Sequence, residues 1–209
     1  MLRNLLAPAL ILAASAIAAG PLPELRTEPI GGGSIFHVHN PGSQPLTGFL
    51  IELVNYPGSY YALWQDDLAA PLAAGADKQI QVTNMTVGAV PDYVKITAAI
   101  YADGSSAGAP EKVAMFVERR RAVLETTREL IGRIGKTPSK PDLIAALKQW
   151  AEALQPQGRN TRTQAAVNQI ASRSLVLETA AEIESSTIEQ AVATLRSSEK
   201  RLAASKPAL

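Results

Sequence analysis

Residues 94–134 read VKITAAIYADGSSAGAPEKVAMFVERRRAVLETTRELIGRI, and two different periodicities meet in them. The first eight residues alternate with period two, which is typical of a β-strand. From Pro110 onward, apolar residues recur every three or four positions, which predicts a helix to about residue 135. Asp103-Gly104 lies between the two patterns and predicts a tight turn, because this dipeptide suits positive φ. The inward-facing strand residues are expected to be Val94, Ile96, Ala98 and Ile100. We therefore predict a segregated α+β chain in which β-strands precede helices.

The residues before this junction have the pattern of an antiparallel β-sandwich of the immunoglobulin-like kind, over residues 34–108. Alternating segments recur about every ten residues, with Pro and Gly turn signals between them. The expected strands are 34–40, 46–55, 60–64, 78–83 and 94–101. A small barrel is the alternative architecture. Residues 20–33 contain three prolines and three consecutive glycines, so we expect a flexible lead-in without regular helix or central strand.

Residues 109–209 are predicted to form a helical region, with helices at about 110–135, 141–155 and 161–204. The third segment has no Pro or Gly, and its thin apolar stripe is close to heptad spacing. That pattern favours a helical hairpin or a coiled-coil contact. Ser185-Ser186-Thr187 is the place where the helix would bend or restart, because these residues prefer helix caps to helix interiors.

Residues 1–19 have the features of a signal peptide. Arg3 supplies a positive start, a short apolar run follows, and Ala16-Ile17-Ala18 fits a cleavage site. An uncleaved anchor is the alternative, but the run is shorter than the roughly 20 residues that span a bilayer. No later stretch is long and apolar enough to span. We expect a periplasmic or secreted bacterial protein with no membrane span after cleavage.

Composition excludes several classes of function. The chain has no cysteine, which excludes disulfides, thiol catalysis and iron–sulfur clusters. Its net charge is +1, which argues against nucleic-acid binding. Residues 20–108 carry 3 basic and 8 acidic side chains, a net charge of −5, whereas residues 109–209 carry 16 and 11, a net charge of +5. Opposite charges would help the two parts dock on each other or on partners, although each set is also compatible with a solvated surface.

Two segments resemble a recurrent type of exported bacterial protein that has no assigned activity. They are HNPGSQPLTGFLIEL at residues 39–53 and VKITAAIYADGSSAG at residues 94–108, the latter followed by a helix with an arginine run. In that type, an immunoglobulin-like sandwich ends in an aromatic-x-D-G-S motif and passes into helices. The resemblance covers residues 34 to about 121, and it implies the same order of β module and helices here.

His37 and His39 are the candidate metal ligands. Two residues apart on a strand, they point to the same face. Such a pair can hold copper, nickel or zinc if a third ligand approaches, and Glu52, Asp66 and Asp67 are the acids considered. The alternative is a pair of exposed strand histidines.

A second candidate site is an aromatic cluster. Its members are Tyr56, Tyr60, Tyr61 and Trp64. Aromatic rings gathered in this way can form a platform for a sugar or a peptide, because they combine a large apolar surface with a polar edge. The alternative is that they close one end of the sandwich.

Arg119, Arg120 and Arg121 are a third candidate surface, for an anionic partner. Adjacent helical residues point in directions about 100° apart, so the three side chains do not form one patch by themselves. Neighbouring glutamates on the same helix can neutralise part of their charge.

Gly104-Ser105-Ser106-Ala107-Gly108 has G-x-S-x-G spacing, but it falls on the turn expected at Asp103-Gly104, and no companion catalytic motif accompanies it. We expect no cofactor and no enzymatic activity. The function predicted is an exported scaffold or recognition protein of the bacterial envelope, which binds a protein partner or itself through residues 109–209. The alternative is a small periplasmic metal-binding protein that uses the histidine pair. A hydrolase with its site between the two parts has less support.

Overall fold

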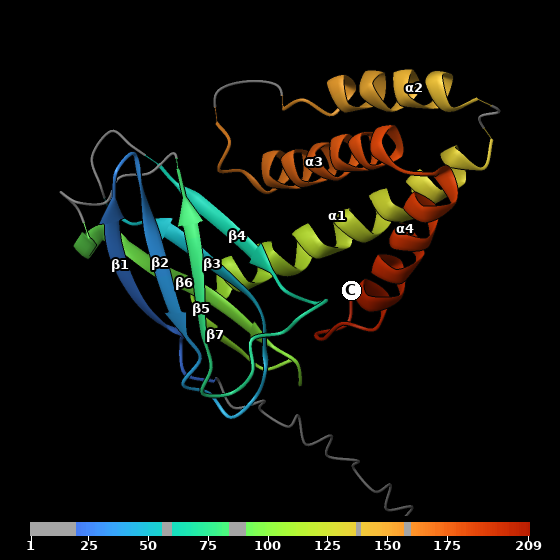
Figure 1. Cartoon of the computed structure of the whole chain (residues 1–209). Helices are drawn as coiled ribbons and strands as arrows, with labels where there is room; N and C mark the ends of the chain where they lie inside the picture. The colour runs from blue at the N-terminus through green and yellow to red at the C-terminus, as the bar shows by residue number, and fades with distance from the viewer. Residues whose placement is uncertain (1–19, 56–59, 84–90, 137–138, 157–159) are drawn as a thin grey trace, which may run out of the picture.

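The computed structural model describes residues 20–55, 60–83, 91–136, 139–156 and 160–209. In Figure 1 two antiparallel sheets come first in the chain and four helices follow, which is the predicted α+β layout. The expected signal segment and Tyr56 lie outside the described residues. Within the described residues, no helix is long and apolar enough to cross a membrane.

The strands form a three-stranded sheet with the order β1-β2-β5 and a four-stranded sheet with the order β4-β3-β6-β7. A short 3₁₀ turn, Pro91–Tyr93, precedes β6. The strands are β1 (Glu24–Ile30), β2 (Gly33–His39), β3 (Leu46–Leu53), β4 (Ala62–Asp66), β5 (Asp77–Val82), β6 (Val94–Tyr101) and β7 (Ser106–Gly108). Apolar side chains from both sheets share one core, which includes Phe36 and Val38 from β2 and Phe49 and Ile51 from β3.

The expectation of a flexible lead-in at 20–33 is wrong for most of that segment. Residues 24–30 form β1, which pairs with β2 from Glu24 opposite His39 to Ile30 opposite Gly33. β1 is the edge strand of its sheet, so the missing N–H of Pro29 is tolerated there. Gly31 and Gly32 turn the chain into β2, and Gly32 adopts a φ of 81° that favours glycine.

The prediction for the inward-facing residues of β6 is half wrong. Val94 and Ile96 face the shared core, but Ala98 and Ile100 face the opposite side of the sheet, where they pack near Phe116. The pairing of β3 with β6 shifts between Leu50 and Ile51, which have Ala98 and Ile96 as partners. Such a bulge adds one residue and reverses the alternation beyond it.

The helices are α1 (Pro110–Ile134), α2 (Lys140–Ala153), α3 (Gln164–Ser185) and α4 (Ile188–Ala203). The segment expected as one helix at 161–204 is therefore divided at Ser186. Thr187 caps the start of α4 with a capping box, in which its hydroxyl accepts from the backbone N–H of Gln190 and the Gln190 side chain accepts from the backbone N–H of Thr187. The helices pack with α2 on α3, and with α3 and α4 on α1.

Helix α1 belongs to both parts of the molecule. Its first half lies on the outer face of the four-stranded sheet, where Lys112, Phe116 and Arg120 follow one another at four-residue intervals on one face of the helix. Its second half contributes Leu130 and Ile134 to the helical core.

Candidate functional site

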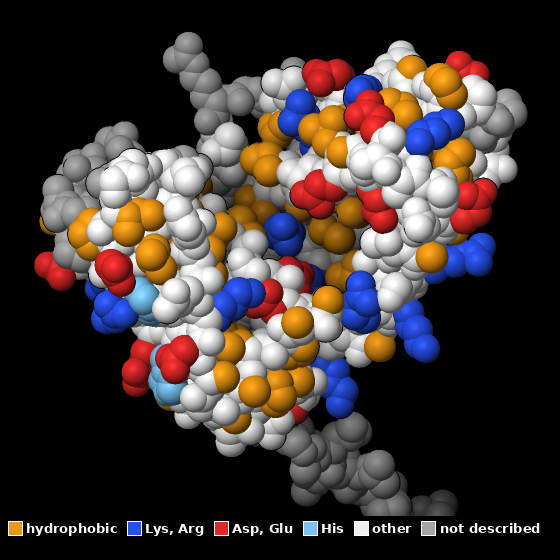
Figure 2. All heavy atoms as spheres, viewed as in Figure 1, with side chains coloured by type: hydrophobic (Ala, Val, Ile, Leu, Met, Phe, Trp, Pro, Cys, Tyr) orange, Lys and Arg blue, Asp and Glu red, His pale blue; other side chains and the backbone are white. Residues whose placement is uncertain are grey.

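Two adjoining cavities lie between the edge strand β4 and the helices. The first has a volume of about 330 Å³, and its polar lining comprises Asp66, Arg119, Thr127, Ser174, Glu178, Ser198 and Arg201. The second has a volume of about 320 Å³ and is lined by Tyr60, Tyr61, Trp64, Val167 and Ile170. Both cavities are also lined by Arg119, Ala171 and Ser174, so we treat them together as the sheet–helix groove. Figure 2 shows a hollow between the β part and the helices, with charged side chains inside it.

The three adjacent arginines diverge, as their helical spacing requires, and only one of them enters the groove. Arg120 is completely buried, and its guanidinium donates to both carboxylate oxygens of Asp66 at 3.1 and 2.9 Å and to the carbonyl oxygen of Thr47 at 2.9 Å. Arg121 pairs with Glu118 on the surface. The interpretation of Arg120 as part of an exposed binding surface is therefore wrong: this residue anchors α1 to the sheet.

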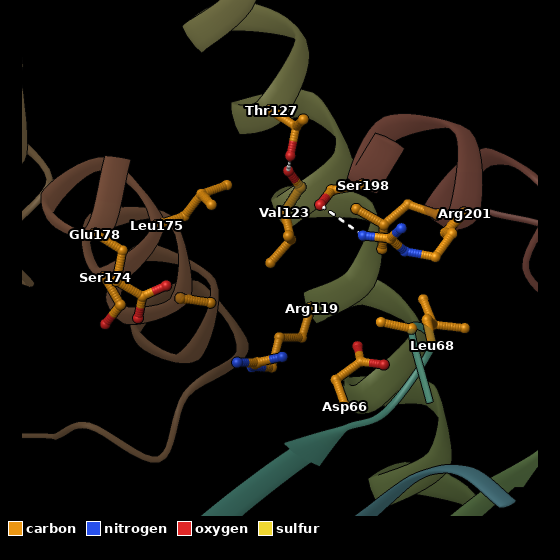
Figure 3. A pocket seen from close by; sticks show the side chains of 13 residues that line it. Asp66, Leu68, Arg119, Val123, Thr127, Ser174, Leu175, Glu178, Ser198 and Arg201 are labelled. Carbon is orange, nitrogen blue, oxygen red and sulfur yellow. Dashed lines mark hydrogen bonds between the residues drawn. The ribbon is translucent and has the colours of Figure 1, made fainter. Parts of the chain in front are cut away.

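Arg119 is the arginine that lines both cavities. Figure 3 shows its side chain extending from α1 into the space toward Ser174 and Glu178 of α3. Its guanidinium lies 5.9 Å from the ring centroid of Trp64, and it makes no hydrogen bond or ion pair with any residue that the structure describes. Burial lowers the pKa of Arg119 and the Asp66 carboxylate opposes this effect, but an arginine remains charged in any case.

The described aromatic residues of the predicted cluster form the wall opposite α3. Trp64 packs against Phe116 with ring centroids 5.5 Å apart, which places it over the outer face of the sheet. Tyr61 meets Phe36 edge-on at 6.4 Å, so it also closes the shared core, as the alternative interpretation proposed. Tyr60 carries the guanidinium of Arg162 at 4.3 Å from its ring centroid. Tyr60, Tyr61 and Trp64 thus line the same cavity as Arg119, although the sequence had placed Arg119 on a separate candidate surface.

Beneath the aromatic wall lies a buried carboxylate, that of Glu52. It accepts hydrogen bonds from Thr97 at 2.5 Å, from Lys112 at 2.7 Å and from Tyr60 at 3.3 Å. Glu52 was considered as a third metal ligand, but it lies on β3 of the other sheet from the histidines and is engaged by α1. Its role is to hold Tyr60 and the start of α1 in place.

We expect the Tyr60 phenol to ionise at an unusually high pH. Burial, then the charge and hydrogen bond of Glu52, raise its pKa to about 12, while Arg162 opposes them. Since the phenol keeps its proton longer in the folded state, its contribution to stability is complete below the unfolded pKa near 10 and is lost as the pH rises toward 12. Spectrophotometric titration of phenolate absorbance should show that Tyr60→Phe removes a late-titrating group, and that Glu52→Gln makes it titrate earlier. If the phenol that Tyr60→Phe removes from the titration curve has an ordinary tyrosine pKa near 10, the raised pKa of Tyr60 is contradicted.

The histidine pair lies far from the groove, on the outer face of the three-stranded sheet. His37 hydrogen-bonds Glu28 at 2.8 Å and His39 hydrogen-bonds Asp77 at 3.0 Å, so each ring has its own carboxylate. Asp67, another acid considered as a ligand, is paired with Lys78 at 2.6 Å. Over the ranges that the structure describes, no three His, Asp or Glu side chains are grouped so that they could hold a metal ion.

Sequence reasoning missed the helical wall of the groove. Ile170, Ser174 and Glu178 from α3 and Arg201 from α4 come from segments about 100 residues or more beyond the aromatic cluster. Their spacing of four residues marks only one helix face. No sequence motif links that face to β4. No protein-family model matches the chain, and no curated protein or solved structure shows a significant match to it.

Proposed function

We propose that this chain is a non-enzymatic recognition protein of the bacterial envelope, exported through residues 1–19, which holds a protein partner in the sheet–helix groove. The observation that carries the proposal is that Arg119 of α1 projects into one concave site whose walls come from β4 and α3. A concave site with apolar walls and a few polar groups is the usual form of a binding site. Its helical wall lies within 109–209, the region for which a partner is expected.

The finer architecture in this proposal is an immunoglobulin-like sandwich. With the strands lettered in chain order A, B, C, C′, E, F and G, the two sheets read A-B-E and C′-C-F-G. In immunoglobulin-like domains A, B and E share one sheet, C, F and G share the other, and C′ is added beside C. Domains of this kind commonly present binding surfaces at their edges and loops. In this protein the edge strand is β4, and the groove uses it.

The helical part contributes a second element to the proposal. Helices α2 and α3 run side by side in opposite directions in Figure 1, and we propose that they act as a helical hairpin that supports the far wall of the groove. Their shared apolar contacts include Leu143, Leu147 and Ala151 on α2 and Val176, Ala180 and Ile183 on α3. The position of Val167 and Ile170 at the groove is then fixed by the packing of α3 against α2 and α1.

The test is site-specific photo-crosslinking in intact source cells, with a photoreactive amino acid at Ile170. Ile170 is 42% exposed at the groove. Leu22 is 40% exposed beside β1 and provides a control position of matched accessibility. We expect crosslinking from Ile170 to capture one partner protein reproducibly. Crosslinking from Leu22 should not capture that partner. Crosslinks only to other copies of the chain would favour self-association instead, and an absence of crosslinks specific to Ile170 contradicts the proposed function.

A further inference from the structure

We infer that the sheet–helix groove recognises an acidic peptide segment in which a carboxylate side chain lies next to an aromatic or large apolar one. This inference rests on the proposed function and adds the chemistry of the partner. The carboxylate is assigned to Arg119 in the first cavity, and the apolar side chain to the aromatic wall of the second cavity. Three observations carry it: the distribution of paired arginines, the acids in the first cavity, and the division of polar and apolar lining.

Arginines without a carboxylate partner gather at the groove. Six of the ten arginines that the structure describes form an ion pair with Asp or Glu. Three of the other four border the groove: Arg119, Arg162 and Arg201. Among the residues that the structure describes, Arg201 donates only to the hydroxyls of Ser197 and Ser198, at 2.6 and 3.1 Å, and Arg162 lies over Tyr60. Among the described residues, these three guanidinium groups therefore have no carboxylate in ion-pair contact, although the charges of Asp66 and Glu178 act on Arg119.

The acids in the first cavity favour a carboxylate over a phosphate. Asp66 lines the cavity, but Arg120 occupies both of its oxygens. Glu178 lines the opposite side from α3 and is exposed. With Asp66 neutralised by Arg120, the charges of Arg119, Arg201 and Glu178 leave the cavity with a net charge of +1. One carboxylate balances that charge, whereas a doubly charged phosphate exceeds it. The planar fork of the Arg119 guanidinium also matches a carboxylate with two parallel hydrogen bonds.

The lining of the second cavity favours a neighbouring aromatic or large apolar side chain. Trp64 and Tyr61 form one wall, and Val167 and Ile170 form the other. An aromatic ring that enters there can pack against Trp64, while Ser174 and Thr161 offer hydroxyls for the peptide backbone. Because the two cavities share Arg119, a short segment that fills both must place its acidic and apolar side chains close together.

The test uses two peptides blocked at both ends, Gly-Glu-Phe-Glu-Gly and Gly-Gln-Phe-Gln-Gly, added to the folded chain. Binding is followed by NMR through the indole N–H of Trp64 and the guanidinium Nε–H of Arg119. We expect the glutamate peptide to shift both signals and the glutamine peptide to bind about tenfold more weakly or less, since a charged hydrogen bond is lost. Arg119→Met should weaken the glutamate peptide by a similar factor, Arg119→Lys by less, and Arg121→Met not at all.

Several results would overturn the inference. Equal binding of the two peptides removes the carboxylate from recognition. Binding that is unaffected in a folded Arg119→Met variant places the carboxylate elsewhere. If neither peptide shifts the two signals but vesicles containing phosphatidylglycerol do, and Arg119→Met abolishes that effect, the groove meets a lipid surface instead. A partner crosslinked at Ile170 through a segment without acids sinks the inference while the proposed function stands.

Discussion

Replacing Arg120 with methionine is expected to lower the free energy of unfolding by about 3–5 kcal/mol, as is usual when one member of a buried ion pair is removed. The substitution leaves the carboxylate of Asp66 and the carbonyl oxygen of Thr47 without their donor, and it disturbs the contact with Phe116, whose ring centroid lies 5.1 Å from the guanidinium. The Asp66 side chain is 20% exposed, so partial hydration places the loss toward the lower end of this range. Urea unfolding followed by circular dichroism measures it.

Arg121→Met provides the matched control for this experiment. Arg121 is the next residue on α1, its side chain is 41% exposed, and its partner Glu118 is also on the surface. We expect a change within about 0.5 kcal/mol, as for most surface substitutions. The variant pair Arg120→Met and Asp66→Asn, combined in a double-mutant cycle, should show strong coupling. Equal losses from Arg120→Met and Arg121→Met would mean that this ion pair does not hold α1 on the sheet.

Gly108→Ala is expected to be at least as damaging, at about 3 kcal/mol or more, because backbone strain and overlap combine at this position. Gly108 has a φ of 100°, which side chains of L-residues rarely adopt, and a Cβ there would overlap the carbonyl oxygen of Thr97. The same carbonyl accepts a hydrogen bond from the N–H of Ala109 at 2.9 Å, so relieving the overlap disturbs the start of α1. Thermal unfolding of the purified variant measures the loss.

Gly132→Ala is the control, and the expected sign is opposite. Gly132 lies in the exposed interior of α1, with nothing within 4 Å of an added Cβ. Alanine is favoured over glycine in a helix by up to about 1 kcal/mol, so this variant should be more stable than the original chain. If Gly108→Ala is tolerated as well as Gly132→Ala, the passage from β7 into α1 does not have the tight geometry described above.

The order of strands and helices could be predicted because hydrophobic periodicity is a local property. The strand at 94–101 and the helix from Pro110 match β6 and α1 closely. Prediction failed where a distant element decides the outcome. β1 is stabilised by pairing with β2 despite its proline, and the two faces of β6 depend on a bulge that only the alignment with β3 reveals. Neither the pairing nor the bulge can be predicted from the sequence of the segment alone.

The candidate site was predicted in separate pieces. The aromatic residues and the arginine run were each identified from local chemistry, but their meeting depends on α1 lying against β4. The role of Arg120 was inverted, because a charged residue is normally exposed and its partner Asp66 lies 54 residues earlier in the chain. No local pattern indicates that a helix face containing Ile170 and Ser174 stands opposite an edge strand.

Helix α1 packs against the sheet with its first half and within the helical core with its second half, and this has a consequence for binding. One continuous helix carries the sheet contacts at Phe116 and the helical core at Leu130, so the separation of the groove walls is set when the chain folds. A ligand meets a pre-organised site, and little conformational entropy remains to be lost on binding. The same packing makes the groove selective for size, because side chains that fit volumes of about 330 and 320 Å³ can enter without moving α1 from either of its two supports.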